Sequence, residues 1–364
     1  MKAKFANYVP RLLRHIPKFR KMRIGVLGDL MLDRYLWGTA NRLSPEAAVP
    51  VVDFVSQTDC LGGAGNVAAN LQGLGAHVEV FGVIGATRSG SKTHDDDAGR
   101  VLRACFRASG IGQRGLLSDH RRLTTIKTRV IARHQQIVRI DQERRDPLVP
   151  ETEESLFRAL LASLKKLDAL ILSDYDKGLI TDAFVDRVLN ACHQNEISVF
   201  VKPKTSRLCA YRGARAIVCN AKEAANYVMR PLKNEKSIVE AGHALLAHFG
   251  CAAAIITRGE QGMSLFEEGS SGELHIPATS FEISYARVGQ PGLSREAAGR
   301  QVFDVTGAGD TVLSVLSLAA AAGASIQDAA ILANTAAGVV VGKLGTAGLS
   351  CEELEAALKE IYPR

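Results

Sequence analysis

The sequence lacks any apolar run long enough to cross a lipid bilayer. Its longest apolar stretches, Val312 to Ala322 and Ala329 to Val341, are interrupted by polar residues or glycine and fall short of the ~20 residues that a transmembrane helix needs. The basic segment Met1 to Arg23 has its charges scattered among apolar residues and no small-residue cleavage site, unlike a secretory signal. We therefore predict a cytoplasmic protein with no membrane partner.

Cysteine and aromatic residues are few and show no functional spacing. The seven cysteines are an odd number with no C-x-x-C pair and no histidine spacing typical of zinc, which predicts reduced thiols and no structural metal. Aromatic residues make up 5% of the chain, too few for a platform on which single-stranded nucleic acid stacks. The net charge of +7 fits either a nucleic acid or an anionic small substrate, but the basic N-terminal residues are best explained as a solvated helix face. We predict no nucleic-acid partner.

Other absences narrow the class of protein. No Walker A sequence is present, which argues against a P-loop nucleoside triphosphatase. No internal repeat or low-complexity tract is found either. What remains is a 364-residue chain that is 46% hydrophobic and 23% charged, an ordinary composition for a globular protein with a sizeable core.

Short apolar runs alternate with helical patterns along most of the chain, after a predicted N-terminal helix from Val9 to Phe19. Strands that alternate with helices indicate βαβ units and a mostly parallel sheet, so the predicted fold class is α/β. Helices are expected between the strands, for example Glu151 to Lys166 and Thr181 to Gln194. The predicted strands are Arg23 to Asp29, Val78 to Val83, Ala169 to Ser173, Ser198 to Val201, Ala216 to Cys219 and Ala252 to Thr257.

Two segments break this alternation. Leu36 to Phe54 and Thr124 to Asp141 are rich in β-formers with alternating apolar residues, and a polar turn at Arg133 to Gln136 divides the second. We predict that they form a small β lid, over about residues 36–58 and 122–141, within a single domain that spans residues 1–364. The apolar alternation of the lid predicts a hydrophobic face that must be buried, and therefore a dimer through the lids; its members are Val49, Val51, Phe54, Ile126, Val130 and Ile137.

The last third of the chain is predicted to be helical, over residues 308–322, 326–342 and 351–361. Before it, Tyr285 to Arg300 contains glycine, proline and charged residues and predicts a long loop.

The strongest chemical signal is the segment Asp304 to Thr311, followed directly by an apolar helix. Glycines in this turn let backbone amides converge at a helix N-terminus, where the dipole favours an anion. Asp310 lies in the first helical turn, so a carboxylate that takes a proton and an anion hole face the same point, which suits phosphoryl transfer. An isolated acidic residue there would more simply complement the helix dipole, but Asp304 and Thr306 favour the catalytic interpretation. The amides come from Gly307, Ala308 and Gly309.

A second glycine-rich segment, Gly62 to Ala68, opens a predicted helix that runs to about Leu74. It formally fits G-x-G-x-x-A, the dinucleotide-binding pattern. We reject that interpretation because the segment does not follow the first strand and is preceded by the polar residues Ser56 to Cys60. Close approach of the backbone to a polyhydroxylated ligand, with Asn66 binding sugar hydroxyls, is the better hypothesis.

Three weaker signals follow. Asn220 to Glu223 and Thr257 to Gly262 each come after a predicted strand, and Asn334 lies on an apolar late helix. Taken singly, they are better explained as a strand-end turn, a hairpin turn and a helix-packing residue.

Together, these motifs resemble the ribokinase (phosphofructokinase-B) family of sugar kinases, which carry an early Gly-Gly, a middle Asn-x-x-Glu and a late Asp-Thr-Gly-Ala-Gly-Asp. Within that family the chain is similar to the bacterial D-glycero-β-D-manno-heptose 7-phosphate kinases, over about residues 23–350. The segments that carry the closer likeness are Gly28 to Tyr35, Arg42 to Val51, Ser173 to Gly178 and Asp304 to Asp310.

The resemblance implies a ribokinase-like fold and transfer of the ATP γ-phosphoryl group to the anomeric hydroxyl of heptose 7-phosphate, in lipopolysaccharide synthesis. It implies that Asp310 is the base and that the amides of residues 307–309 form the anion hole. Asn220 and Glu223 would organise Mg²⁺ through water, and a monovalent cation such as K⁺ would fit the family. The nucleotide site would include Thr257, Gly259, Gly262, Asp304 and Asn334.

The sugar site implied by the resemblance contains Asp29, Asp33, Gly62, Gly63 and Asn66. A substrate phosphate far from the reacting hydroxyl also needs fixed cations. Lys177 is favoured, because it follows a strand end at the ligand-binding edge of a parallel sheet. The other candidates lie on lid segments; they are Arg42, Arg129 and Arg139. For each the alternative is a solvated surface charge, and for Arg129 and Arg139 the two interpretations are about equal.

The chain departs from the heptose kinases at Val201-Lys202-Pro203-Lys204, where they usually have Val-Asp-Pro-Lys. A cation therefore replaces a carboxylate at a position expected near the nucleotide. No His-x-Gly-His segment of a nucleotidyltransferase domain is present, so we expect a monofunctional kinase. The alternatives are a kinase for another sugar, such as ribose or fructose 6-phosphate, and a non-catalytic sugar- or nucleotide-binding regulator. The presence of both Asp304 and Asp310 argues against the regulator, which needs no base.

Overall fold

The computed structural model describes residues 9–89, 92–133, 135–204, 211–279, 307–343 and 348–361. Within them, a 10-stranded, mostly parallel sheet has the order β14-β13-β12-β11-β10-β9-β1-β4-β5, with β6 also paired to β4. Its strands are β1 (Arg23–Gly28), β4 (His77–Ser89), β5 (Lys92–Asp95), β6 (Gly112–Asp119), β9 (Ala169–Ser173), β10 (Ser198–Lys202), β11 (Ala216–Asn220), β12 (Ala253–Thr257), β13 (Met263–Glu267) and β14 (Leu274–Ile276).

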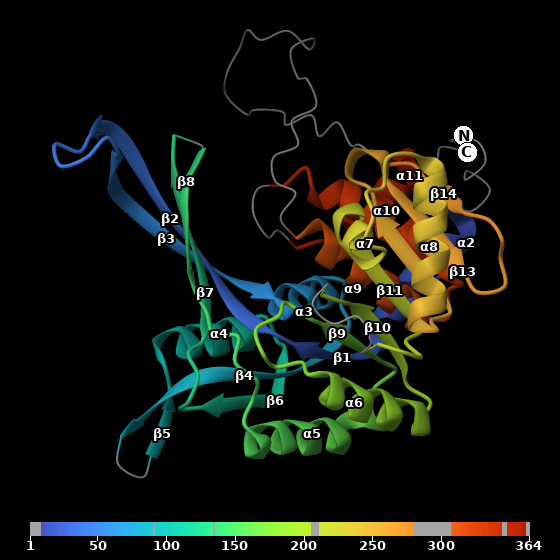
Figure 1. Cartoon of the computed structure of the whole chain (residues 1–364), viewed down its shortest axis with the longest axis horizontal. Coiled ribbons are helices and arrows are strands. Elements are labelled where there is room, and N and C mark those ends of the chain that lie inside the picture. The colour runs from blue at the N-terminus through green and yellow to red at the C-terminus, as the bar shows by residue number, and fades with distance from the viewer. Residues whose placement is uncertain are drawn as a thin grey trace, which may run out of the picture.

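Helices cover both faces of this sheet and bury two apolar clusters (Figure 1). One face packs against α2 (Val9–Leu13), α3 (Ala64–Gly73), α4 (Asp97–Ala108), α9 (Ala308–Ala321), α10 (Ile326–Val340) and α11 (Cys351–Ile361). The other packs against α5 (Pro150–Leu164), α6 (Asp182–Gln194), α7 (Ala221–Tyr227) and α8 (Glu235–Phe249). The predicted α/β fold is confirmed.

The predicted N-terminal helix is wrong in its extent. It is divided into α2 and the 3₁₀ helix η1 (Ile16–Lys21). Pro17 lies at the start of η1 and has no N–H to donate to the carbonyl of Leu13, so a continuous α-helix would lose a hydrogen bond there.

The buried parallel strands match their predicted ranges closely because their apolar runs are buried on both faces. β5, β6, β13 and β14 were not predicted from the sequence, and β4 extends beyond its predicted end at Val83. β6 alternates between buried and exposed residues, and β5 is largely exposed, so neither has a continuous apolar run.

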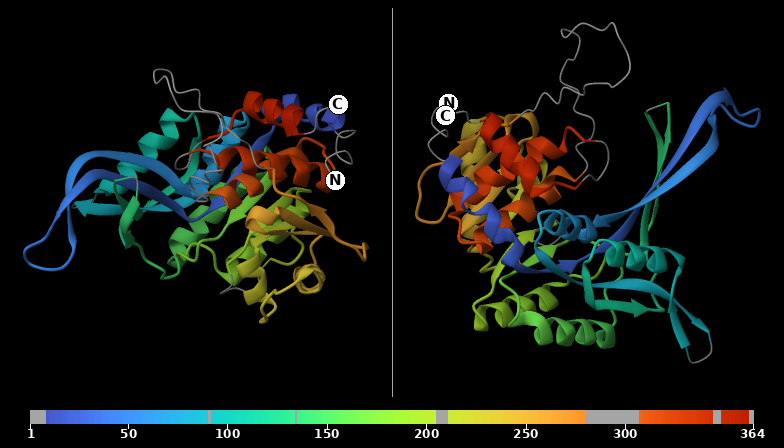
Figure 2. Two further views of the ribbon diagram at one scale, coloured as in Figure 1. Left: turned by 90° about the horizontal axis from the view of Figure 1, so that it is seen from above. Right: turned by 180° about the vertical axis from the view of Figure 1, so that it is seen from behind.

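A separate 4-stranded sheet, the lid, has the order β3-β2-β7-β8. It consists of β2 (Leu30–Leu43), β3 (Pro50–Gly63), β7 (Thr125–Ala132) and β8 (Gln135–Gln142), and it projects away from the main sheet (Figures 1 and 2). The segment Ser56 to Cys60 lies within β3 although its residues are polar. Polar residues are tolerated there because most of β3 is exposed in the lid rather than buried in the core. A dinucleotide-binding turn follows a parallel strand of a βαβ unit. The strand that leads into Gly62 is β3, which is antiparallel to β2 in the lid, so the turn is not of that kind.

The strand ends position the candidate site. β1, β9 and β10 are parallel neighbours, so Gly28, Ser173 and Lys202 end at one edge of the sheet. The lid begins at Leu30, immediately after β1, and returns at Gly63 to the start of α3. Ligands of open α/β sheets bind at this carboxyl edge.

Candidate active site

Asp310 is buried and accepts hydrogen bonds from three side chains that come from different elements. Tyr175 Oη and Lys202 Nζ both donate to Oδ1, each at 2.6 Å. Asn66 Nδ2 donates to Oδ2 at 2.9 Å. The carboxylate is thereby held in one orientation at the carboxyl edge of the sheet.

Packing of α3 against α9 fixes Asn66 beside Asp310. Asn70 Nδ2 donates to the Asn66 carbonyl at 2.8 Å, and Thr311 Oγ1 donates to Asn70 Oδ1 at 3.1 Å. Ser314 Oγ lies 3.1 Å from the Val67 carbonyl. These buried polar contacts tie the two helices in one register, so the glycine-rich segment lies beside the first turn of α9.

The anion hole was predicted at the first turn of α9, and it stays a prediction. Gly307 is its N-cap with a φ of 88°, a left-handed conformation that favours glycine. The helix begins at Ala308, and the first amides of a helix have no acceptor within it, so they are available to an anion. Asp304 and the 285–300 loop lie outside the described residues.

Tyr175 lies on the loop after β9, and Asp29 holds that loop through hydrogen bonds to its backbone. Asp29 Oδ2 accepts the backbone N–H groups of Tyr175 at 2.8 Å and of Lys177 at 3.2 Å. Burial, together with the charge of Asp174, raises the pKa of Asp29 to about 6. Burial and the neighbouring Asp310 also raise the pKa of Tyr175, which keeps its hydroxyl a donor. Asp29 thus holds the loop, and its contact with a sugar stays a prediction.

At the base of the lid, Asp33 pairs with Arg129 at 2.8 Å, and both are buried. Burial raises the pKa of Asp33 and Arg129 opposes that shift. A Cβ at Gly62 would lie 2.7 Å from Asp33 Cγ, so glycine is needed for this approach. Asp33, Arg129 and Gly62 therefore lie together at the base of the lid. Binding of a sugar by Asp33 and Gly62, and of a phosphate by Arg129, stays a prediction.

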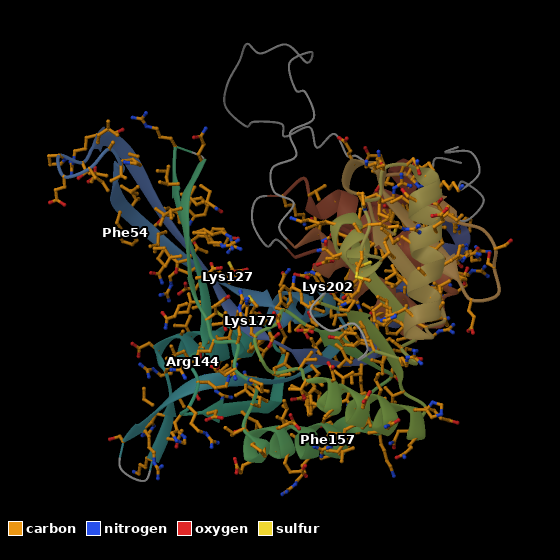
Figure 3. The ribbon with its side chains drawn as sticks, viewed as in Figure 1. Phe54, Lys127, Arg144, Phe157, Lys177 and Lys202 are labelled. Carbon is orange, nitrogen blue, oxygen red and sulfur yellow. The ribbon has the colours of Figure 1, made fainter. Side chains whose placement is uncertain are left out.

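Lys177 lies in a group of charges between the lid and the main sheet, where Figure 3 labels it with Lys127. Glu143 accepts an ion pair from Lys177 at 2.8 Å and from Lys127 at 3.3 Å. Burial works against the ionised Glu143, but Lys177 and Arg145 lower its pKa to about 2. Lys177 is thus a fixed, buried cation, although a carboxylate already neutralises part of its charge.

The other two predicted phosphate cations do not join this group. Arg139 pairs with Asp141 on β8 and is 51% exposed. Arg42 pairs with Asp53 near the outer end of β2 and is 66% exposed. Within this chain both arginines form ion pairs at the surface. This fits the alternative interpretation from the sequence, that each is a solvated surface charge.

Asn220 and Glu223 form the capping box of α7. Asn220 Oδ1 accepts the N–H of Glu223 at 2.8 Å, and Glu223 Oε2 accepts the N–H of Asn220 at 2.9 Å. Lys204 Nζ lies 3.7 Å from the other Glu223 oxygen. The box holds both side chains at the carboxyl end of β11, and binding of Mg²⁺ through water stays a prediction.

The predicted nucleotide residues lie near the far edge of the sheet. Thr257 ends β12, and Gly259 and Gly262 lie in the turn to β13 with φ values of 59° and 85°. Asn334 Nδ2 donates to the Pro277 carbonyl at 2.8 Å, so it tethers α10 to the segment after β14. That contact fits the helix-packing interpretation, and a nucleotide role for Asn334 stays a prediction.

Comparison with known proteins identifies the family. Residues 22–353 match the description "pfkB family carbohydrate kinase". The chain belongs to this family. This membership confirms the resemblance drawn from the motifs and makes the chain a sugar kinase, whose reaction uses ATP and usually Mg²⁺.

Relatives and solved structures agree with this assignment. The pfkB-family chain is 43% identical over 333 residues to the "Bifunctional protein HldE" of Geobacter sulfurreducens, covering 92% of this chain and 62% of that protein. The chain thus spans about 62% of that relative's length. Escherichia coli phosphofructokinase-2 in complex with potassium has a TM-score of 0.69 at 15% identity, covering 93% of this chain and 98% of that one. Arabidopsis thaliana ribokinase complexed with ribose and ATP has a TM-score of 0.67 at 17% identity, covering 93% and 98%. At these identities the structures show the shared ribokinase-like fold.

Other observations of this pfkB-family chain bear on the absences predicted from the sequence. Among the described residues, no helix is both long and apolar enough to span a membrane. The same residues contain no cluster of three or more His, Cys, Asp or Glu side chains that could hold a metal. No disulfide bond joins the six cysteines of the described ranges to one another.

Two contacts of the site were not predicted from the sequence, those of Tyr175 and of Lys202 with Asp310. Lys202 was expected near the nucleotide, and its ammonium group contacts the carboxylate of Asp310, a contact that was not predicted. The one usable signal was that Lys202 and Tyr175 lie at or just after the ends of two predicted strands. The structure pairs these strands, β9 and β10, side by side at the ligand-binding edge.

Proposed function

We propose that this sugar kinase transfers the γ-phosphoryl group of ATP to the anomeric hydroxyl of D-glycero-β-D-manno-heptose 7-phosphate, giving the 1,7-bisphosphate for lipopolysaccharide core synthesis. The observation that carries the proposal is the placement of Asp310, a buried and fully oriented carboxylate in the first turn of α9. A base and an anion-binding turn are thus adjacent, as phosphoryl transfer requires. The heptose assignment is supported by the motifs from residue 28 to 51 and from 173 to 178.

The chemistry follows from the roles of the chain's groups. Asp310 Oδ2 has one hydrogen-bond partner among the described residues and keeps an acceptor position for the substrate hydroxyl. The hydroxyl oxygen attacks the γ-phosphorus while its proton passes to Asp310. The new O–P bond forms, the bond to the bridging oxygen breaks, and its electron pair leaves with ADP. The amides at the start of α9 stabilise the charge on the transferred group.

The lid site supports a phosphorylated sugar. Asp33, buried against Arg129, would bind sugar hydroxyls, and Lys177 would bind the distal phosphate. A K⁺ ion would stabilise the anion hole; potassium is present in the cited structure of phosphofructokinase-2. The enzyme would work in the cytoplasm, where ATP and sugar phosphates are found.

A substrate comparison tests this function. Removing the contact of Lys177 with the phosphate is worth ~1.5–3 kcal/mol, so Lys177→Ala should lower kcat/KM for heptose 7-phosphate by roughly one to two orders of magnitude. The already poor reaction with unphosphorylated heptose should change little. If the wild type uses heptose and heptose 7-phosphate equally well, the distal-phosphate site and the heptose-phosphate assignment both fail.

A further inference from the structure

Lys202 stands where the related heptose kinases usually have a carboxylate, and its surroundings suggest a use for the added cation. Its Nζ lies 2.6 Å from Asp310 Oδ1 and 3.3 Å from Tyr175 Oη. The side chain is 18% exposed and Asp310 is 7% exposed, so solvent screens this pair only weakly. Burial opposes the charge of Lys202, but Asp310 and Tyr175 outweigh that effect and raise the pKa of the ammonium group. Lys202 is therefore charged at neutral pH.

The ammonium group also lies beside the predicted anion hole. A Cβ placed on Gly309 would be 3.5 Å from Lys202 Nζ, so the cation borders the first turn of α9. An ammonium has three donor hydrogens, and two partners accept from it within the described residues, Asp310 and Tyr175. The third hydrogen is available to an anion that enters the turn.

The charge of Lys202 offsets that of the Asp310 carboxylate. Without Lys202, the Asp310 carboxylate would repel the terminal phosphate of ATP as it approaches the helix N-terminus. Lys202 cancels that charge and can donate to a phosphoryl oxygen at the same time. The flexible lysine stem allows the small movement that such a contact needs.

We propose that Lys202 is a further catalytic residue of this chain, which binds the γ-phosphoryl group of ATP while it neutralises Asp310. This inference rests on the proposed kinase reaction. Lys202 exchanges no proton and forms no covalent bond; it donates a hydrogen bond to an oxygen of the γ-phosphoryl group as that group passes from ATP to the sugar hydroxyl and ADP leaves. Its neighbour Lys204 faces a different partner, Glu223.

The test compares the binding of two nucleotides in the absence of sugar. ADP lacks the γ-phosphate, so a contact of Lys202 with that group should strengthen the binding of an ATP analogue and not of ADP. Calorimetry would measure the affinities of Mg²⁺–ADP and of the non-hydrolysable analogue Mg²⁺–AMP-PNP for four proteins: wild type, Lys202→Met, Asp310→Asn, and the double variant. The double variant leaves no uncompensated buried carboxylate, so it should fold even if Lys202→Met alone does not. Circular dichroism checks folding.

The preference is the ratio of the affinity for Mg²⁺–AMP-PNP to that for Mg²⁺–ADP. We expect this ratio to be at least about tenfold lower in the double variant than in Asp310→Asn, because the double variant lacks the charged contact of Lys202 with the γ-phosphate. Lys343→Met is the matched control and should leave the preference unchanged. Lys343 also forms a 2.6 Å lysine–carboxylate pair, with Glu353, and is 20% exposed.

Equal preferences in Asp310→Asn and the double variant would overturn the inference, because Lys202 would then only neutralise Asp310. The proposed function fails separately, and the inference with it, if the wild type binds neither nucleotide.

Discussion

At the scale of single residues, Asp29 should give stability a distinct pH dependence. Its pKa in the folded chain is about 6, above the ordinary 3.8, so the folded state binds more protons than the unfolded state between about pH 4 and 6. The free energy of unfolding therefore falls as pH rises through this window and stays reduced above it. Asp29→Asn keeps an oxygen acceptor for Tyr175 and Lys177 and removes the buried charge, so it should gain up to about 3 kcal/mol at pH 8.

Urea denaturation at pH 4, 6 and 8 measures this gain, which should shrink toward zero as pH falls to 4. Asp186→Asn, at an exposed position on α6, is the control and should show no such trend. A gain for Asp29→Asn that is constant with pH would show that burial of its charge is not the cause.

The residues of the site differ in how far the sequence could predict them. Asp310 and its turn were predictable because glycine spacing before an apolar helix specifies local backbone geometry. The contact of Lys202 and Tyr175 with Asp310 was not, because it depends on how the ends of β9 and β10 meet α9, residues far apart in the chain. Similarly, Asn220 and Glu223 suggested a ligand site, while their hydrogen bonds satisfy the start of α7.

At the scale of elements, the turn between β12 and β13 allows a matched pair of substitutions. Gly259 and Gly262 both have positive φ, so alanine at either costs about 1–2 kcal/mol in backbone strain. A Cβ at Gly262 would also lie 2.1 Å from the Ile276 carbonyl oxygen, whereas one at Gly259 meets nothing within 4 Å. Gly262→Ala should therefore lower the melting temperature clearly more than Gly259→Ala. Equal losses of melting temperature in the two variants would contradict this, because they would mean that β14 moves away from the added Cβ without cost.

The elements themselves were predictable to the extent that their burial is uniform. β9 and β12 are apolar runs buried on nearly every residue, and both appear close to their predicted ranges. β3 extends to Gly63, past the predicted lid limit at about residue 58, because its inner end from Leu61 to Gly63 is buried and has no apolar alternation. Ile137 was grouped with Val130 on one apolar face, but a register shift between Val130 and Ile131 pairs Val138 with Val130 instead.

At the scale of the whole molecule, the lid predicts self-association. Phe54, Val138 and Ile140 are 65%, 47% and 57% exposed, and exposed apolar side chains of this size favour a protein interface. Figure 3 labels Phe54 on the projecting lid. We propose that two chains associate through their lids. Phe54→Asp should shift the dimer toward monomer in sedimentation at micromolar concentration.

The control for this prediction is Leu161→Asp, which places the same charge at a 41% exposed leucine of α5, outside the lid. It should leave the sedimentation coefficient unchanged. A wild type that sediments as a clean monomer at these concentrations would count against association through the lids.

The central claim, that Asp310 is the base of a sugar-phosphate kinase, is tested most directly by turnover of ATP and heptose 7-phosphate with mass-spectrometric detection of the bisphosphate. The wild type should form heptose 1,7-bisphosphate and ADP in equal amounts. Asp310→Asn should remain folded and bind nucleotide, but turn over ~10²–10⁴-fold more slowly, the usual effect of losing a general base. A variant within a few-fold of the wild type in kcat, or a wild type that phosphorylates no sugar or sugar phosphate, would contradict the account.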